Sequence, residues 1–199
     1  MGCKIVVNAA KTTKYKVSGD TLKDIWADIE KKGPQDPNDK KRVAAITSTE
    51  IAVSSKWNEE VRDGKCMKDG SYQSVVGVKD MTMTLSSTIK LPALGSHKLS
   101  KKAKKEWDRF SKKLEAHEKE HVAKAKKLAE EIAAEIMALT GVGVAASYED
   151  SVAQGKASFL AVYSSLYNGK LLSARINGVH AEFDKKSKHG AKHGASLDT

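Results

Sequence analysis

Arginine and aromatic residues are scarce in this sequence, although the chain is strongly basic. Its 199 residues include 35 lysines and arginines against 25 aspartates and glutamates, a net charge of +10. The arginines are Arg42, Arg62, Arg109 and Arg175, and aromatic residues make up 6%. Base readout and phosphate clamps favour the guanidinium group, and single-stranded nucleic acids stack on aromatic rings. We therefore interpret the lysines as a solvated surface, and we do not expect a nucleic-acid partner.

Long hydrophobic runs are also absent, and cysteine is rare. No stretch approaches the ~18 consecutive apolar residues of a membrane span. The N-terminus has no apolar segment long enough for an intact signal peptide. Cys3 and Cys66 are the two cysteines. In an oxidising compartment we expect them to form a disulfide, and the alternative is two unpaired thiols.

Residues 1–95 combine strand and helix patterns. Residues 21–32 place apolar side chains at helical spacing. Alternating patterns typical of strands follow at 42–57 and at 72–94, where Pro92 is expected to end the strand. This part predicts a small, mostly antiparallel sheet with one helix.

Residues 96–199 form the helical part. Apolar residues recur at helical spacing over 99–139, which predicts a helix far longer than average. A second helical stretch follows over 151–184, with a break expected near Gly169, and the chain closes in a Gly/His/Lys-rich tail. The sheet, its helix, the long helix and the second helical stretch together predict an α+β fold.

One face of the long helix is apolar, and two histidines and a glutamate interrupt it. At 100° per residue, His121 lies in the middle of this face, Glu118 about 20° to one side, and His117 just past the other edge. The apolar residues of the face are Trp107, Phe110, Leu114, Ala125, Leu128, Ile132, Ile136 and Leu139. A glutamate on a buried face costs several kcal/mol unless it is paired or coordinated. Its presence there therefore requires a reason.

Zinc supplies that reason, because His117-Glu118-x-x-His121 has the spacing of an HExxH motif. Histidines at i and i+4 on one helical face can present two imidazoles to a single ion. Glu118 would lie beside the open position of the ion and could take a proton from the water whose pKa zinc lowers. The alternative is that both histidines are satisfied core residues and that Glu118 is an ordinary surface residue.

A zinc site of this kind needs a third protein ligand, which must come from the second helical stretch or the tail. Glu130, Glu131 and Glu135 lie on the same straight helix and cannot fold back to the ion. The remaining candidates are Glu149, His180, Glu182, Asp184, His189 and His193.

Four segments resemble the bacterial "domain of unknown function 922" family, described as predicted secreted zinc-dependent proteases. They are "YKVSGDTLKDIWADIEKKGP" (15–34), "TIKLPAL" (88–94), "WDRFSKKLEAHEKEH" (107–121) and "FDKKSKHGAKHGA" (183–195). The resemblance implies that His117 and His121 are metal ligands, that Glu118 is the catalytic base and that His189 is the third ligand. Phe183 departs from the family pattern, where tyrosine is usual. The resemblance also implies a secreted or periplasmic location and one zincin-like unit.

The sequence as a whole predicts a zinc metallopeptidase that acts on a protein or peptide substrate. The strand "DMTMTLSS" (80–87) is expected to offer an edge to an extended substrate. Candidates for a transition-state stabiliser are Tyr148, Tyr163, Tyr167 and His180. Two alternatives remain open: a non-catalytic module stabilised by zinc, and a basic protein that binds nucleic acid or another anionic polymer. The sequence does not indicate an oligomeric state.

Overall fold

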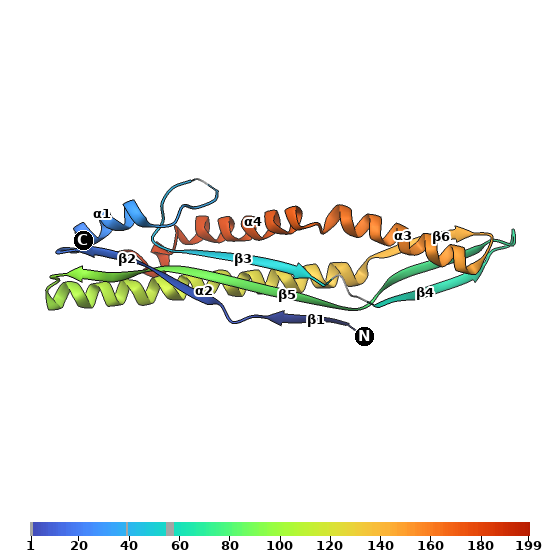
Figure 1. The fold of residues 1–199 in the computed structure, drawn as a ribbon, viewed down its shortest axis with the longest axis horizontal. Coiled ribbons are helices and arrows are strands. Elements are labelled where there is room, and N and C mark those ends of the chain that lie inside the picture. Colours follow the sequence, from blue (N-terminus) through green and yellow to red (C-terminus); the bar gives the residue numbers. More distant parts are fainter. Residues whose placement is uncertain (1, 39, 55–57) are drawn as a thin grey trace. The chain divides into compact units, whose positions relative to one another are not determined.

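The computed structural model describes residues 2–38, 40–54 and 58–199, and it confirms the predicted α+β class (Figure 1). The described elements are β1 (Gly2–Val7), β2 (Lys11–Gly19), α1 (Leu22–Lys32), β3 (Ile46–Val53), β4 (Asn58–Cys66), β5 (Tyr72–His97), α2 (Lys101–Ala138), β6 (Thr140–Ala145), α3 (Tyr148–Leu166), α4 (Gly169–Ser187) and the 3-10 turn η1 (Ala191–His193). The last part of the strand pattern at 42–57, residues 55–57, lies outside the described residues. None of the described helices combines the length and the hydrophobicity of a membrane span.

The chain divides into two compact units, each built from three separate stretches of sequence. Unit 1 contains residues 1–7, 51–85 and 127–175, and unit 2 contains residues 8–50, 86–126 and 176–199. Both units take part of β5 and part of α2, because these two elements are long. Every residue of the HExxH motif belongs to unit 2.

The sheet is mixed, so the expectation of a mostly antiparallel sheet was wrong. Among the described residues, each of the other strands pairs with β5. β4 and β6 run antiparallel to β5, but β1 and β2 run parallel to it. A parallel pair requires a long connection instead of a tight hairpin. The connections from β1 and β2 to β5 are long enough because α1, β3 and β4 lie between them in the sequence.

β5 continues to His97, so Pro92 does not end it. Pro92 lies opposite Tyr15 of β2 in a parallel register. A proline is tolerated in a strand where its missing N–H is not needed by a neighbouring strand. The strand segment 80–87 is not a free edge either, because Asp80–Leu85 pair with β1 and the amide of Ser54 donates to the carbonyl oxygen of Thr82. The expectation that this segment receives a substrate was therefore wrong.

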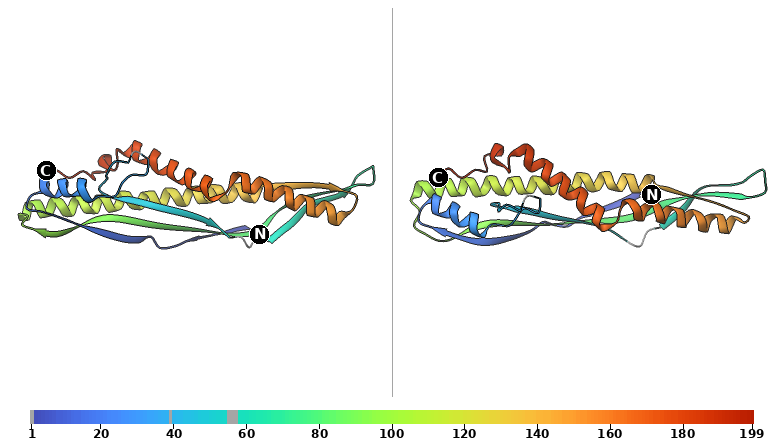
Figure 2. Two further views of the ribbon diagram at one scale, coloured as in Figure 1. Left: turned by 45° about the horizontal axis from the view of Figure 1, so that its top comes forward. Right: turned by 90° about the horizontal axis from the view of Figure 1, so that it is seen from above.

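In unit 1, the helix break predicted after residue 139 is followed by strand β6, which packs closely on α3 (Figures 1 and 2). A Cβ atom at Gly141 would lie 2.1 Å from the carbonyl oxygen of Gly155, and one at Gly143 would lie 2.0 Å from that of Ser151. Glycine is therefore required at both positions because the backbone of α3 occupies the space of a side chain.

Both cysteines lie in unit 1, and their positions on its strands show whether they can form a disulfide. Cys3 lies opposite Met81 on β5, and Cys66 lies opposite Tyr72, nine residues away along the same strand. Nine residues of strand span roughly 30 Å, whereas a disulfide needs Cα atoms within about 7 Å. The expected disulfide was wrong, and both thiols are unpaired.

In unit 2, α1 begins and ends where the sequence predicts. Thr21 caps its N-terminus and forms a capping box with Asp24, and Gly33 ends it. The helix packs against β2, and Ile25 and Ile29 join a buried core with Phe110 of α2. This core fixes the orientation of α2, because it buries one side of the helix near the HExxH motif.

The long helix and the break after it were predicted correctly. α2 covers Lys101–Ala138, and the second helical stretch is divided into α3 and α4 by Tyr167 and Asn168. The side chain of Asn168 accepts a hydrogen bond from the amide of Leu171, which begins α4. The break near Gly169 allows the last turns of α4 and the tail to belong to unit 2.

Candidate metal centre

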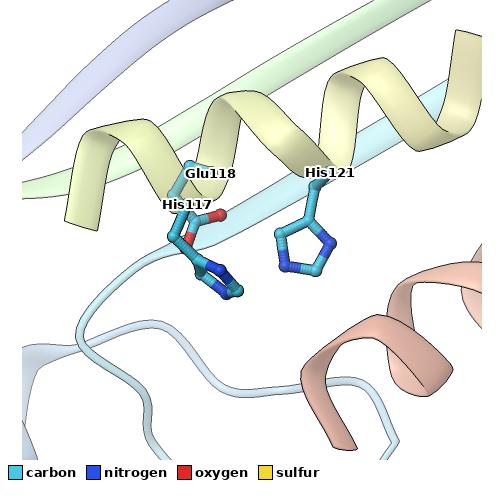
Figure 3. Close-up of side chains that lie close together, drawn as sticks. All are labelled: His117, Glu118 and His121. Carbon is cyan, nitrogen blue, oxygen red and sulfur yellow. The ribbon is translucent and has the colours of Figure 1, made fainter. Parts of the chain in front are cut away.

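Three polar side chains are buried on the predicted apolar face of α2. The relative exposure is 2% for His117, 3% for Glu118 and 4% for His121, while Leu114 and Ala125 on the same face are buried. Figure 3 shows the three polar side chains projecting to the same side of α2. The helical period therefore placed them correctly, and their burial removes the interpretation of Glu118 as a surface residue.

The two imidazoles of α2 converge on one carboxylate of α4. The Nε2 atom of His117 lies 3.2 Å from Oδ1 of Asp184, and Nε2 of His121 lies 3.1 Å from the same oxygen. On its other side, His121 places Nδ1 3.0 Å from Nδ1 of His180. Since His180 and Asp184 are four residues apart on α4, they share one face of that helix.

Asp184 is held as an anion by these neighbours. Its burial raises the carboxyl pKa, but hydrogen bonds from His117 and His121 outweigh that effect, and the pKa lies well below its ordinary value. His180, in contrast to Asp184, is uncharged. Burial and the neighbouring charge of His121 lower its pKa to about 4, so this imidazole is neutral near pH 7.

Glu118 contacts β3 through the side chain of Thr47. The hydroxyl of Thr47 donates to Oε2 of Glu118 at 2.7 Å. Burial raises the pKa of Glu118, and the Thr47 hydrogen bond together with the two histidines opposes the rise. One carboxylate oxygen of Glu118 also lies within 4.8 Å of one ring nitrogen of His117 and one of His121. Asp184 is nevertheless the carboxylate that lies within 3.2 Å of both Nε2 atoms.

Phe183 fixes the planes of the two imidazoles. Its ring stacks on His117, with a centroid distance of 4.9 Å and an interplanar angle of 23°, and it meets His121 edge-on at 4.8 Å. The ammonium group of Lys124 lies 4.6 Å from the centre of the same ring. Phe183 is thus an apolar support for both rings, although it stands where the resembling family usually has tyrosine.

The Gly/His/Lys-rich tail is folded against this centre. Gly190 has a left-handed backbone, with φ of 82°, and its amide hydrogen bonds to Ser187. The guanidinium of Arg109 donates to the carbonyl oxygens of Gly194 at 2.6 Å and Ser196 at 2.7 Å. Arg109 also donates to Glu106, and these hydrogen bonds hold the pKa of that carboxyl at about 2.

Replacing Gly190 with alanine should loosen this part of the centre. An added Cβ would lie 3.0 Å from Cγ of His117 and 3.0 Å from Cβ of Ala195. A side chain in the left-handed region destabilises the folded state by about 1–2 kcal/mol. For this chain length, that loss corresponds to a melting temperature lower by roughly 2–8 °C. Differential scanning calorimetry of the metal-free protein measures this difference.

Gly178→Ala is the matched control for that variant. Gly178 lies within α4, and an added Cβ there meets no atom within 4 Å. Alanine in a helix interior is more stable than glycine by roughly 0.5–1 kcal/mol, so this control should melt slightly higher than the wild type. A Gly190→Ala protein that melts as high as Gly178→Ala would contradict the assigned packing on His117.

Of the predicted third ligands, His180, Asp184 and His189 lie at or next to the convergence point. Nδ1 of His189 is 3.8 Å from Oδ1 of Asp184, and the His189 side chain is 54% exposed. His193 is farther along the tail, with Nδ1 3.7 Å from Oε2 of Glu120. Glu182 pairs with Lys186. Among these candidates, Asp184 therefore has the carboxylate oxygen nearest to both Nε2 atoms, and His189 lies beside it.

The remaining predicted residues belong to unit 1. Glu149 lies in the first turn of α3, and Tyr148 contacts Tyr72 edge-to-face. Tyr163 stacks between Phe159 and Tyr167, whose hydroxyl donates to Glu135. Among the four candidates for a transition-state stabiliser, His180 is the one that lies beside the HExxH histidines.

A pocket of about 410 Å³ opens beside the convergence point within unit 2. Its walls include His117, Glu118, His121, Asp184 and residues 44–49, the last four of which belong to β3. This volume falls within the usual range for ligand pockets, about 300–1,000 Å³. A reacting group bound there would contact the buried glutamate and the imidazoles at the same time.

Sequence reasoning missed two residues of this pocket, Thr47 and Asp36. Thr47 begins a run of four polar residues in β3, Thr47 to Glu50, and this run gives no sign of the contact with Glu118, 71 residues away. Asp36 lies in a polar loop before β3, is only 6% exposed and lines the pocket. The spacing of His180 and Asp184 is a signal that could have favoured Asp184 over His189, because it matches the i, i+4 spacing on α2.

Comparisons with known proteins give one match. No curated protein and no solved structure matches the chain. A family model described as "Bacterial protein of unknown function (DUF922)" matches residues 12–190. The match includes α1, the HExxH helix and the segment from His180 to His189, and it agrees with the resemblance of the four sequence segments.

Proposed function

This chain belongs to the DUF922 family of bacterial proteins, and we propose that it is a zinc-dependent metallopeptidase. The observation that carries the proposal is the convergence of two buried Nε2 atoms and one carboxylate oxygen beside a buried glutamate. The alternative in which the histidines are incidental is disfavoured, because incidental histidines on a lysine-rich helix have no reason to be buried on one face with a glutamate.

The donor atoms fit a zinc ion. With zinc–ligand bonds of about 2.0–2.1 Å, neighbouring donors of a tetrahedral site lie about 3.3 Å apart. The distances from Oδ1 of Asp184 to the two Nε2 atoms are 3.2 and 3.1 Å. We propose His117, His121 and Asp184 as the ligands of this ion, with His189 adjacent. His180 would position His121, since a neighbour at Nδ1 leaves Nε2 free for the metal.

Glu118 has the position of a general base. Zinc bound to the three ligands would polarise a peptide carbonyl and lower the pKa of a water molecule. Glu118 would accept the proton of the attacking water and later transfer it to the leaving amine. Because Thr47 donates to Oε2, Oε1 is the oxygen assigned to the proton. Thr47 is a positioning residue in this scheme.

The substrate is proposed to be an extended protein or peptide segment. β3 borders the pocket. Among the described residues, β3 pairs with β5 along one of its edges. Its other edge can add a strand through backbone hydrogen bonds, which do not depend on the side chains of the substrate. We also propose a secreted or periplasmic location, and this rests on the family resemblance.

Removal of the metal tests the proposal directly. We expect the zinc-loaded full chain to hydrolyse an unfolded protein, a chelator to abolish the hydrolysis, and added zinc to restore it. Release of new amino termini measures the activity. Protein that binds zinc but cleaves no member of a broad peptide library would instead support the non-catalytic, zinc-stabilised module. Protein that binds no zinc would exclude both functions.

A further inference from the structure

Asp184 belongs to a second group of metal-binding side chains, in addition to the pair of histidines on α2. Asp36, Asp184 and His189 can each offer one ligand atom such that these atoms all lie within 4.8 Å of one another. The three residues line the pocket that contains His117 and His121. The second group is therefore adjacent to the proposed zinc position and shares one carboxylate with it.

Asp36 is placed in this group by a tightly bonded loop. Its amide donates to the carbonyl oxygen of Lys41, its carbonyl oxygen accepts from the amide of Lys40, and its Oδ1 accepts from the amide of Asn38. The residue is only 6% exposed. A carboxylate at this depth is costly without a compensating cation or a full set of donors.

His189 is placed in the group by an unusual backbone. Lys188 and His189 have φ values of 52° and 50°, and Gly190 follows with 82°. Side chains larger than glycine rarely adopt this region. The amide of His189 donates to the carbonyl oxygen of Asp184 at 2.9 Å, which turns the chain so that the imidazole lies beside the Asp184 carboxylate.

We propose that Asp184 bridges two divalent cations, the second one held by Asp36 and His189. This inference rests on the proposed metal centre for its first ion. A carboxylate has two oxygens and can serve two ions, and a set of two carboxylates and one imidazole suits Zn²⁺ or Mn²⁺. Two-metal centres of this kind occur in aminopeptidases and other hydrolases.

Titration of the metal-free full chain with Zn²⁺ alone tests the second position. We expect two zinc ions per chain by native mass spectrometry, with two phases by calorimetry. Asp36→Asn should keep the first ion and weaken the second at least ~10-fold, since even outer-shell partners of a metal are worth 10–100-fold in affinity. Asp69→Asn is the matched control, because Oδ1 of Asp69 accepts from the amide of Ser71, two residues on, as Asp36 does from Asn38.

Each outcome of this titration decides the inference. One zinc per wild-type chain, with hydrolysis intact, overturns the second position and leaves the proposed function in place. No zinc at all overturns both. Two ions of unchanged affinity in Asp36→Asn also exclude this second position. If Asp36→Asn does not fold, as judged by circular dichroism, His189→Ala replaces it, with the exposed His97→Ala as its control, and the same loss of one ion is expected.

Discussion

Replacing His121 with alanine is expected to lower the affinity for the first zinc ion by at least ~10²-fold, because even the loss of an outer-shell partner costs 10–100-fold. His121 is 4% exposed, its Nε2 points at Asp184, and its Nδ1 contacts His180. Its ring is thus already oriented before the metal binds. Competition with a chromophoric zinc chelator measures the affinity, and His97→Ala controls for the loss of an exposed histidine. An unchanged affinity in His121→Ala would end the proposal of a metal centre on α2.

The same measurement assigns the third ligand. Asp184→Asn should weaken zinc binding more than His189→Ala, because Oδ1 of Asp184 is within 3.2 Å of both Nε2 atoms, whereas Nδ1 of His189 lies 3.8 Å from that same oxygen. The reverse order would make His189 the third ligand, as the family resemblance implies. Both residues remained candidates from sequence alone, although the i, i+4 spacing of His180 and Asp184 is a signal that favours Asp184.

The elements that follow a local rule were predictable. The face of α2 follows from the helical period alone, and the buried state of His117, Glu118 and His121 confirms it. The start of α1 follows from its capping residue, and the break before α4 from Asn168-Gly169. Each of these features depends on residues within about four positions of one another, which is the range that a sequence pattern reports.

Features that depend on distant residues were not predictable in the same way. The expected mostly antiparallel sheet was wrong, because nothing in an alternating pattern states which strand is the neighbour. Pro92 was expected to end its strand, because an alternating pattern does not reveal whether the missing N–H faces a neighbouring strand. Thr47 meets Glu118 across 71 residues, and Asp184 meets His117 across 67. Such contacts depend on tertiary packing, so the sequence could identify the α2 side of the centre but only propose its partners.

Replacing Glu118 with glutamine is expected to lower hydrolysis by at least ~10²-fold, the usual scale for the loss of a general base, with zinc content near that of the wild type. Glutamine keeps the volume of the side chain and an oxygen that can accept from Thr47, but it cannot take the proton of the attacking water. Removal of a buried charge should leave the melting temperature equal to or above that of the wild type, because burial already penalises the charged form of Glu118.

Glu115→Gln is the control for this variant, since Glu115 lies on the same helix and pairs on the surface with Lys119. It should retain both zinc and hydrolysis. Loss of zinc in Glu118→Gln would make Glu118 a ligand, and the assignment of Asp184 to that role would then be wrong. Unchanged hydrolysis with zinc bound would remove Glu118 from the chemistry. The predicted combination, zinc retained and hydrolysis lost, is expected only if the buried glutamate acts on the water and not on the ion.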